Sequence, residues 1–168
     1  GPTAPFPCDA ITISPYLGAD SLEPFCQTAA QCQGGVFVLV RTSNPGAEGW
    51  QAKIADEVAT WVEKRGSSSL GSCGLSSMGA VVGATWPGAV AHFRTLMPHC
   101  WLLMPGMGAQ GGKAEDTRAA FHSDGLGALV VGARSLTLPP EPTQDIRPFV
   151  QQRLQETLAR LSTVWPCS

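Results

Sequence analysis

The 168-residue sequence is poor in charged residues and has no long apolar stretch. Charged residues make up 14% of the chain and the formal net charge is −2, so the charge balance does not favour binding to nucleic acid. A membrane-spanning helix needs about 18 consecutive apolar residues. The longest apolar runs here, such as residues 36–40, have the length of a strand. We therefore expect neither a nucleic-acid partner nor a membrane.

The sequence also lacks the spacings that are typical of metal sites and disulfide frameworks. None of its six cysteines forms a Cys-x-x-Cys pair, and its three histidines show no metal-ligand spacing. We therefore expect reduced or buried thiols, no metal, and a reducing compartment such as the cytoplasm. The chain begins without Met or a signal peptide. Residues 1–168 are expected to form a single domain, of which residues 1–8 are a linker-like start.

Five short apolar runs recur along the chain, and helical patterns separate them. The runs cover residues 10–13, 35–40, 78–82, 100–104 and 127–131. Such continuous runs are typical of strands buried on both faces of a parallel sheet. The helical patterns begin near Asp20 or Ser21, either of which is a candidate N-cap, and recur at 54–62, 90–97, 116–122 and 146–161. This alternation predicts an α/β fold with parallel strands and right-handed crossovers.

One glycine-rich segment, residues 105–112, directly follows the fourth run. It reads Pro-Gly-Met-Gly-Ala-Gln-Gly-Gly. Its four glycines allow a sharp turn and a close approach of the backbone to a ligand, and Gln110 can both donate and accept hydrogen bonds. A strand that ends in a glycine loop is one way in which α/β proteins hold phosphate. It is not a P-loop, because no Gly-Lys-Ser/Thr follows at the required spacing.

The polar and glycine-rich motifs each follow a strand, which in a (β/α) barrel is the catalytic face. A complete (β/α)₈ barrel usually takes about 250 residues, and this chain supplies five units in 168. The pattern therefore leaves two architectures open, an open α/β sheet and part of a barrel.

Five segments resemble orotidine 5′-phosphate decarboxylases, especially the longer bacterial type. They are residues 9–25, 36–47 with the motif Arg-Thr-Ser-Asn-Pro-Gly-Ala, 81–85, 103–112 and 127–135. They occur in the family's order and spacing across nearly the whole chain. The resemblance implies a (β/α)₈ TIM barrel, of which this chain supplies strands 4–8. It also implies decarboxylation of orotidine 5′-monophosphate (OMP) to uridine 5′-monophosphate (UMP) in pyrimidine biosynthesis.

The resemblance assigns the pyrimidine side of the site to residues after three strands. Ser43 is implied to hydrogen-bond the ring, and Val81 or Val82 to line the pocket near the base. Pro105 would flank the base and its departing carboxylate. Thr85 is expected to help shape the pocket.

The phosphate side follows from the last two motifs. The resemblance implies that Gln110 bridges the ring and the phosphate and that Arg134 clamps the phosphate. The backbone N–H groups of Gly132 and Ala133 would join them. An arginine fork matches phosphate geometry and keeps its charge at every accessible pH.

The family's catalytic lysine and aspartate array is absent from this sequence. The three lysines are Lys53, Lys64 and Lys113, and none occupies a strand end. The resemblance implies no metal and no organic cofactor. We therefore expect no catalytic residue in this chain and no activity from it alone. The remaining strands are expected in an N-terminal part, as a separate chain or as part of the same one, and a homodimer is also implied.

Two other functions stay open. The absent lysine array is compatible with a non-catalytic barrel remnant that serves as a structural or nucleotide-sensing subunit of a larger assembly. A different phosphate-binding barrel enzyme is the third possibility, because barrels support many chemistries.

Overall fold

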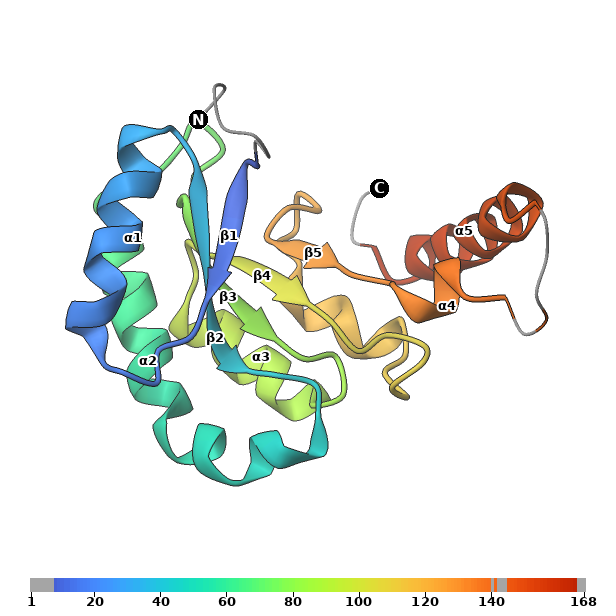
Figure 1. Cartoon of the computed structure of the whole chain (residues 1–168), viewed down its shortest axis with the longest axis horizontal. Coiled ribbons are helices and arrows are strands. Elements are labelled where there is room, and N and C mark those ends of the chain that lie inside the picture. Colours follow the sequence, from blue (N-terminus) through green and yellow to red (C-terminus); the bar gives the residue numbers. More distant parts are fainter. Residues whose placement is uncertain (1–7, 140, 142–144, 166–168) are drawn as a thin grey trace.

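The fold is a five-stranded parallel sheet whose strands pair in chain order (Figure 1). The computed structural model describes residues 8–139, 141 and 145–165, so most of the expected linker-like start lies outside the described residues. The strands are β1 (Ala10–Ile13), β2 (Gly35–Arg41), β3 (Met78–Val82), β4 (Trp101–Met104) and β5 (Ala128–Val130). All five predicted strands and their parallel arrangement are confirmed.

Helices connect successive strands as the alternation predicts. They are α1 (Ala19–Gln31), η1 (Pro45–Glu48), α2 (Trp50–Gly66), α3 (Pro87–Leu96), η2 (Glu115–Ala120), α4 (Arg134–Thr137) and α5 (Arg147–Ser162). The predicted short helix at 116–122 is a 3₁₀ turn, and η1 and α4 were not predicted. Both η1 and α4 are single short turns, too brief to show a helical period in the sequence.

The prediction that the strands are buried on both faces is wrong for every strand except β3: the edge strands β1 and β5 are partly exposed, and β2 and β4 are buried on one face only. Burial alternates along β2 and β4; in β2, Val36, Val38 and Val40 lie in the core whereas the residues between them are only half buried. Helices α1, α2 and α3 cover one face of the sheet (Figure 1). Right-handed crossovers between strands that pair in chain order place every helix on the same side. Only β3, in the middle, is buried along its whole length.

The predicted N-cap of the first helix is also wrong. Helix α1 begins at Ala19, and its N-cap is Gly18 without a side-chain hydrogen bond. Gly18 has a φ of 100°, which suits glycine. Ser21 lies inside the first turn, where its Oγ donates to the carbonyl of Gly18 at 2.7 Å. Asp20 is in the same turn, where a carboxylate is favourable for the helix dipole.

The last helix forms as predicted, but its apolar stripe is left uncovered. Helix α5 lies apart from the sheet, next to α4 (Figure 1). None of its residues is buried, and Leu154 and Leu158 are 45% and 50% exposed. The chain then returns to the sheet, where Trp165 Nε1 donates to the carbonyl of Gly125 at 3.1 Å and the Trp165 ring packs against Phe121.

Candidate functional site

The predicted site residues follow different strands, and the parallel sheet brings them to one edge. Ser43 follows β2, Thr85 follows β3, Gln110 lies in the loop after β4, and Arg134 begins α4 after β5. Because the strands are parallel and pair in chain order, their carboxyl ends lie next to one another. Ligands of α/β proteins bind outside this edge.

Ser43 is the point where two of these loops meet. Its Oγ donates a hydrogen bond of 2.7 Å to Oε1 of Gln110. Two neighbouring positions must be glycine, because a Cβ on Gly83 would lie 2.6 Å from the Cα of Ser43 and a Cβ on Gly106 would lie 2.7 Å from its Cβ. The structure therefore brings together Ser43 and Gln110, as the sequence predicts, and holds Ser43 closely between two glycines.

The glycine loop at 105–112 hydrogen-bonds to itself. Gly106, Gly108 and Gly111 have φ values of 102°, 79° and 95°. The amide of Gly108 donates to the carbonyl of Gly112 at 2.9 Å, and the amide of Gly112 donates back to Gly106 at 3.1 Å. The amide of Gly111 donates to Gly108 at 2.9 Å. These amides are not free for phosphate, so the glycines shape the loop and its side chains are left to bind the ligand.

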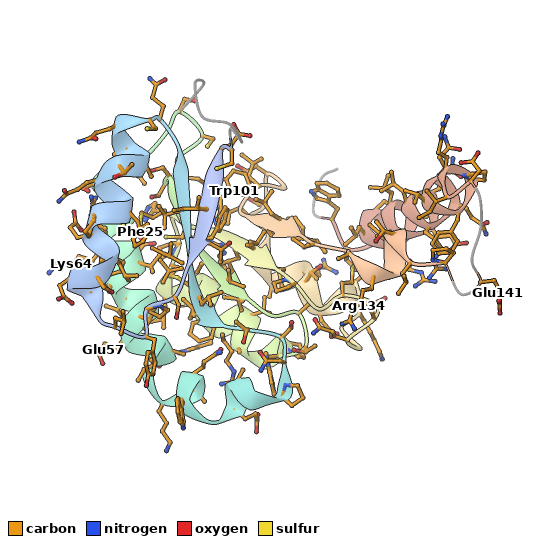
Figure 2. The ribbon with its side chains drawn as sticks, viewed as in Figure 1. Phe25, Glu57, Lys64, Trp101, Arg134 and Glu141 are labelled. Carbon is orange, nitrogen blue, oxygen red and sulfur yellow. The ribbon has the colours of Figure 1, made fainter. Side chains whose placement is uncertain are left out.

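A pocket of about 100 Å³ lies between the glycine loop and the start of α4. Pro105, Gln110, Ala133 and Arg134 all line it. Arg134 is exposed, and its guanidinium has no hydrogen bond or ion pair with any residue that the structure describes. Figure 2 labels Arg134 at the start of α4. A free guanidinium and a glutamine amide at one pocket are suited to an anion with several acceptor oxygens.

The backbone between β5 and α4 offers further donors to this pocket. The strand pairing ends at Val131, whose amide donates to the carbonyl of Met104 at 3.0 Å. The next two amides, of Gly132 and Ala133, find no acceptor within the described residues. Their predicted contact with phosphate is compatible with this geometry and stays a prediction.

Val81 and Val82, the two alternatives for lining the pocket near the base, point to opposite faces of the sheet. Val82 is fully buried and belongs to the core beneath the helices. Val81 is buried outside that core cluster, and successive side chains of a strand point to opposite faces. Val81 therefore lies on the face without helices, and it rather than Val82 is the residue that can border a ligand there.

Thr85, which was expected to shape the pocket, contacts the backbone of Ser43. Its Oγ1 donates to the carbonyl of Ser43 at 3.0 Å. Thr85 is absent from the lining of the 100 Å³ pocket. Thr85 therefore contacts the backbone of Ser43 and does not border the pocket itself.

Helix α5 also reaches this region, which was not predicted from the sequence. Nε of Arg153 donates to the carbonyl of Ser135 at 3.3 Å, and its Nη1 pairs with Glu156 at 2.7 Å. Arg153, Arg160 and Lys113 line a second cavity of about 520 Å³ beside the glycine loop. No periodicity or motif links an amphipathic helix to a distant turn, so sequence reasoning could not find this contact.

The most strongly displaced pKa values lie at the opposite, amino edge of the sheet. Arg94 donates to the carbonyls of Met97, Cys100, Gly127 and Ala120 at 2.7–3.1 Å. Burial lowers the pKa of Arg94 to about 10 and raises the pKa of the Cys100 thiol. These groups precede β4 and β5, so they stabilise the fold and do not belong to the candidate site.

The described residues hold neither a candidate metal cluster nor a candidate membrane helix. No group of three or more His, Cys, Asp or Glu side chains could hold a metal ion there. In that part of the chain, no helix has the length and apolarity that crossing a membrane requires. The five described cysteines are free, and Cys167 lies outside the described residues.

Comparisons with known proteins agree on one family. The family model described as "Orotidine 5'-phosphate decarboxylase / HUMPS family" matches residues 3–149. The orotidine 5′-phosphate decarboxylase of Rhodopirellula baltica is 46% identical over 139 residues, which cover 79% of this chain and 46% of that protein. The chain spans about half the length of the curated relatives that it matches.

Solved structures give the same result. The UMP synthase of Leishmania donovani aligns with a TM-score of 0.69 and 35% identity, covering 91% of this chain and 33% of that one. The OMP decarboxylase of the same organism aligns with a TM-score of 0.67 and 31% identity, covering 92% of this chain and 58% of that one.

Proposed function

Because the chain belongs to the orotidine 5′-phosphate decarboxylase / HUMPS family, we propose that it supplies the substrate-holding part of an enzyme that converts OMP to UMP. The observation that carries the proposal is the hydrogen bond of 2.7 Å between Ser43 and Gln110, in loops that follow different strands. Gln110 and Arg134 line one pocket. A group bound to Arg134 would therefore lie near Gln110, which in turn is hydrogen-bonded to Ser43.

The phosphate end is held by Arg134 and Gln110. The free guanidinium of Arg134 would form a bidentate contact with two phosphate oxygens. Gln110 accepts the Ser43 proton through Oε1, which leaves its Nε2 protons for the phosphate. Phosphate lies far from the bond that breaks, but its binding energy can still stabilise the transition state and hold the glycine loop closed.

The pyrimidine end would be held by Ser43 and Pro105, with Val81 on the face without helices. In the reaction, the bond between C6 and the carboxylate breaks, CO₂ leaves, and the electron pair that stays on C6 takes up a proton. In the family that proton comes from a lysine. Lys53 and Lys64 lie in helix α2 and Lys113 lies beyond the glycine loop. Figure 2 shows Lys64 on the opposite side of the molecule from Arg134, so it is not placed to serve this pocket.

The rest of the site is therefore proposed to come from outside this chain. We propose that the five strands are strands 4–8 of a (β/α)₈ barrel and that β1 and β5 pair with strands of an N-terminal part. The open face of the sheet would then become the barrel interior. A homodimer and a cytoplasmic location are further proposals, and the free cysteines support a reducing compartment.

A non-catalytic, nucleotide-sensing role is the second candidate function. The lysine positions favour it, since the chain can bind a nucleotide without a proton donor at a strand end. The two functions share the same pocket and differ in whether OMP loses CO₂.

The experiment is to measure the intact mass of the natural protein and to titrate it with UMP by calorimetry. A mass above the 17.6 kDa of this chain, or a co-purifying N-terminal fragment, together with UMP binding supports the enzyme. A mass near 17.6 kDa without UMP binding supports a structural role. UMP binding without release of CO₂ from OMP supports the sensing role.

A further inference from the structure

The turn at residues 42–44, which carries Ser43, is held by side chains on both of its sides. Thr42 and Ser43 follow β2 and precede η1. The carbonyl of Ser43 accepts a hydrogen bond from Thr85 Oγ1 at 3.0 Å, and the carbonyl of Thr42 accepts one from Trp86 Nε1 at 2.9 Å. Two consecutive carbonyls of this turn are thus bound by two consecutive side chains of the next loop.

A third side chain binds the same turn from the helix that follows it. The amide of Thr42 donates to Oε1 of Gln51 at 2.7 Å, and Nε2 of Gln51 donates to Oγ1 of Thr42 at 2.9 Å. Gln51 lies in the first turn of α2. The backbone on the N-terminal side of Ser43 is therefore fixed at both its N–H and its C=O.

Trp86 is itself held in place by a charged residue. The guanidinium carbon of Arg41 lies 4.6 Å from the centre of the Trp86 ring, and Nη2 of Arg41 pairs with Glu48 at 3.3 Å. Arg41 is the last residue of β2, so the rigid sheet orients the indole. A cation stacked on an indole face is a favourable contact.

We propose that Thr85 and Trp86 are positioning residues for pyrimidine recognition, Thr85 acting through the backbone of Ser43 and Trp86 through the carbonyl of Thr42. The inference rests on the proposed function, because it assumes that Ser43 meets the pyrimidine ring. Thr85 donates its only hydroxyl proton to Ser43, so it does not donate to the ring. Its effect is to fix the direction in which the Ser43 hydroxyl points, toward Gln110 and the base.

The expected effect is selective for the base. Removal of the Thr85 hydroxyl leaves the Ser43 carbonyl without its partner and lets the turn rotate, which misplaces the Ser43 hydroxyl. Gln110 loses its fixed partner when the Ser43 hydroxyl moves, but Arg134 follows another strand and would still clamp the phosphate. Ligands that carry the base should therefore lose much more affinity than ligands with only the sugar phosphate.

The test compares Thr85→Val, Thr85→Ser and Trp86→Phe in the full-length natural protein. Valine keeps the shape of threonine without the hydroxyl, serine restores the hydroxyl, and phenylalanine keeps a ring without its N–H. Thr95→Val is the matched control, because the Thr95 hydroxyl donates to Ala91 within the exposed face of α3. Calorimetry measures the affinity of each variant for UMP and for ribose 5-phosphate.

We expect Thr85→Val and Trp86→Phe to bind UMP about tenfold more weakly than wild type, with a much smaller loss of affinity for ribose 5-phosphate. Thr85→Ser should restore UMP affinity, and Thr95→Val should match wild type. Equal losses for both ligands, or a lower melting temperature without any change in UMP affinity, would overturn the inference.

Failure of the proposed function has a different signature. A wild-type protein that binds neither UMP nor ribose 5-phosphate would contradict the proposed function and the inference with it. A wild-type protein whose UMP binding requires Arg134, while Thr85→Val binds UMP as wild type does, would overturn the inference alone.

Discussion

Ser43 shows how closely one residue of the site is fitted to its neighbours. Gly83 and Gly106, from the loops after β3 and β4, lie so close to Ser43 that neither position has room for a Cβ. The glycines of the sequence motifs can therefore be explained by packing around Ser43 as much as by a ligand. A side chain added at either position displaces Ser43 from Gln110.

Replacement of Gly83 by alanine should damage the fold and the site together. The added Cβ would lie 2.6 Å from the Cα of Ser43, and overpacking of this kind costs about 2 kcal/mol. The matched control is Gly88→Ala in α3, where no atom lies within 4 Å of the added Cβ. There the free energy of unfolding should stay equal or rise by about 0.5 kcal/mol. Urea denaturation of both variants measures the difference, and equal stabilities would contradict the packing around Ser43.

Replacement of Arg134 by alanine should weaken nucleotide binding far more than nucleoside binding. The expected loss for UMP is about 2–4 kcal/mol, because the phosphate loses a charged partner, and the loss for uridine should be close to zero. Arg118→Ala is a suitable control, since Arg118 is also exposed and lies in η2. Titration of both ligands by calorimetry measures the two losses. Equal losses would refute the phosphate role of Arg134.

For single residues, the sequence predicted which side chains belong to the site better than it predicted the direction in which each side chain points. Ser43 and Gln110 were both recognised from motifs, and their contact follows from the parallel sheet. The choice between Val81 and Val82 could not be made, because a run of buried residues hides which face each one takes. The backbone role of Thr85 could not be predicted either, since no pattern in the sequence indicates which acceptor a hydroxyl finds.

Among the secondary-structure elements, Arg94 of α3 connects the loop before β4 with the loop before β5 through hydrogen bonds. Its four hydrogen bonds end on carbonyls that precede β4 and β5 or end η2. We expect Arg94→Met to lower the free energy of unfolding by at least about 3 kcal/mol, because the carbonyls lose their donor. Arg118→Met, at an exposed arginine of η2, should change it by less than about 0.5 kcal/mol. Thermal denaturation measures both; a small loss at Arg94 would contradict its role.

The neighbouring His122 predicts a loss of stability in acid. Burial and the charge of Arg94 lower the pKa of His122 below its ordinary value of 6.5. Between the two pKa values the unfolded chain binds a proton that the folded chain does not, so stability falls as the pH falls through 6.5 and levels off below the folded pKa. We expect His122→Gln to remove this part of the pH dependence. Unfolding of both proteins across this pH range measures it, and identical pH profiles would contradict the prediction.

The elements themselves were largely predictable, and their ends were not. Apolar runs identified all five strands, because buried strands leave continuous stretches of apolar residues. The start of α1 was misplaced because Asp20 and Ser21 are common N-caps, whereas the positive φ of Gly18 cannot be read from composition. The 3₁₀ geometry of η2 could not be distinguished from an α-helix over so few residues.

In the whole molecule, one face of the sheet and the apolar stripe of α5 have no covering element among the residues that the structure describes. Leu129 and Val131 on the last strand are 44% and 38% exposed, and Leu154 and Leu158 of α5 are also exposed. Continuous apolar runs predicted burial on both faces, and the structure covers only the helix side. The proposed N-terminal part of a barrel would cover this face, and the chain's span of about half the curated relatives supports that proposal.

We propose above that this chain holds the phosphate and the pyrimidine of OMP for a decarboxylase. The most direct measurement is the release of CO₂ from carboxyl-labelled OMP by the full-length natural protein, with and without Arg134→Ala. We expect release by the wild-type protein and a fall in kcat/KM of at least about a hundredfold in the variant. No release by a protein that binds UMP, or equal release by the two proteins, would contradict it.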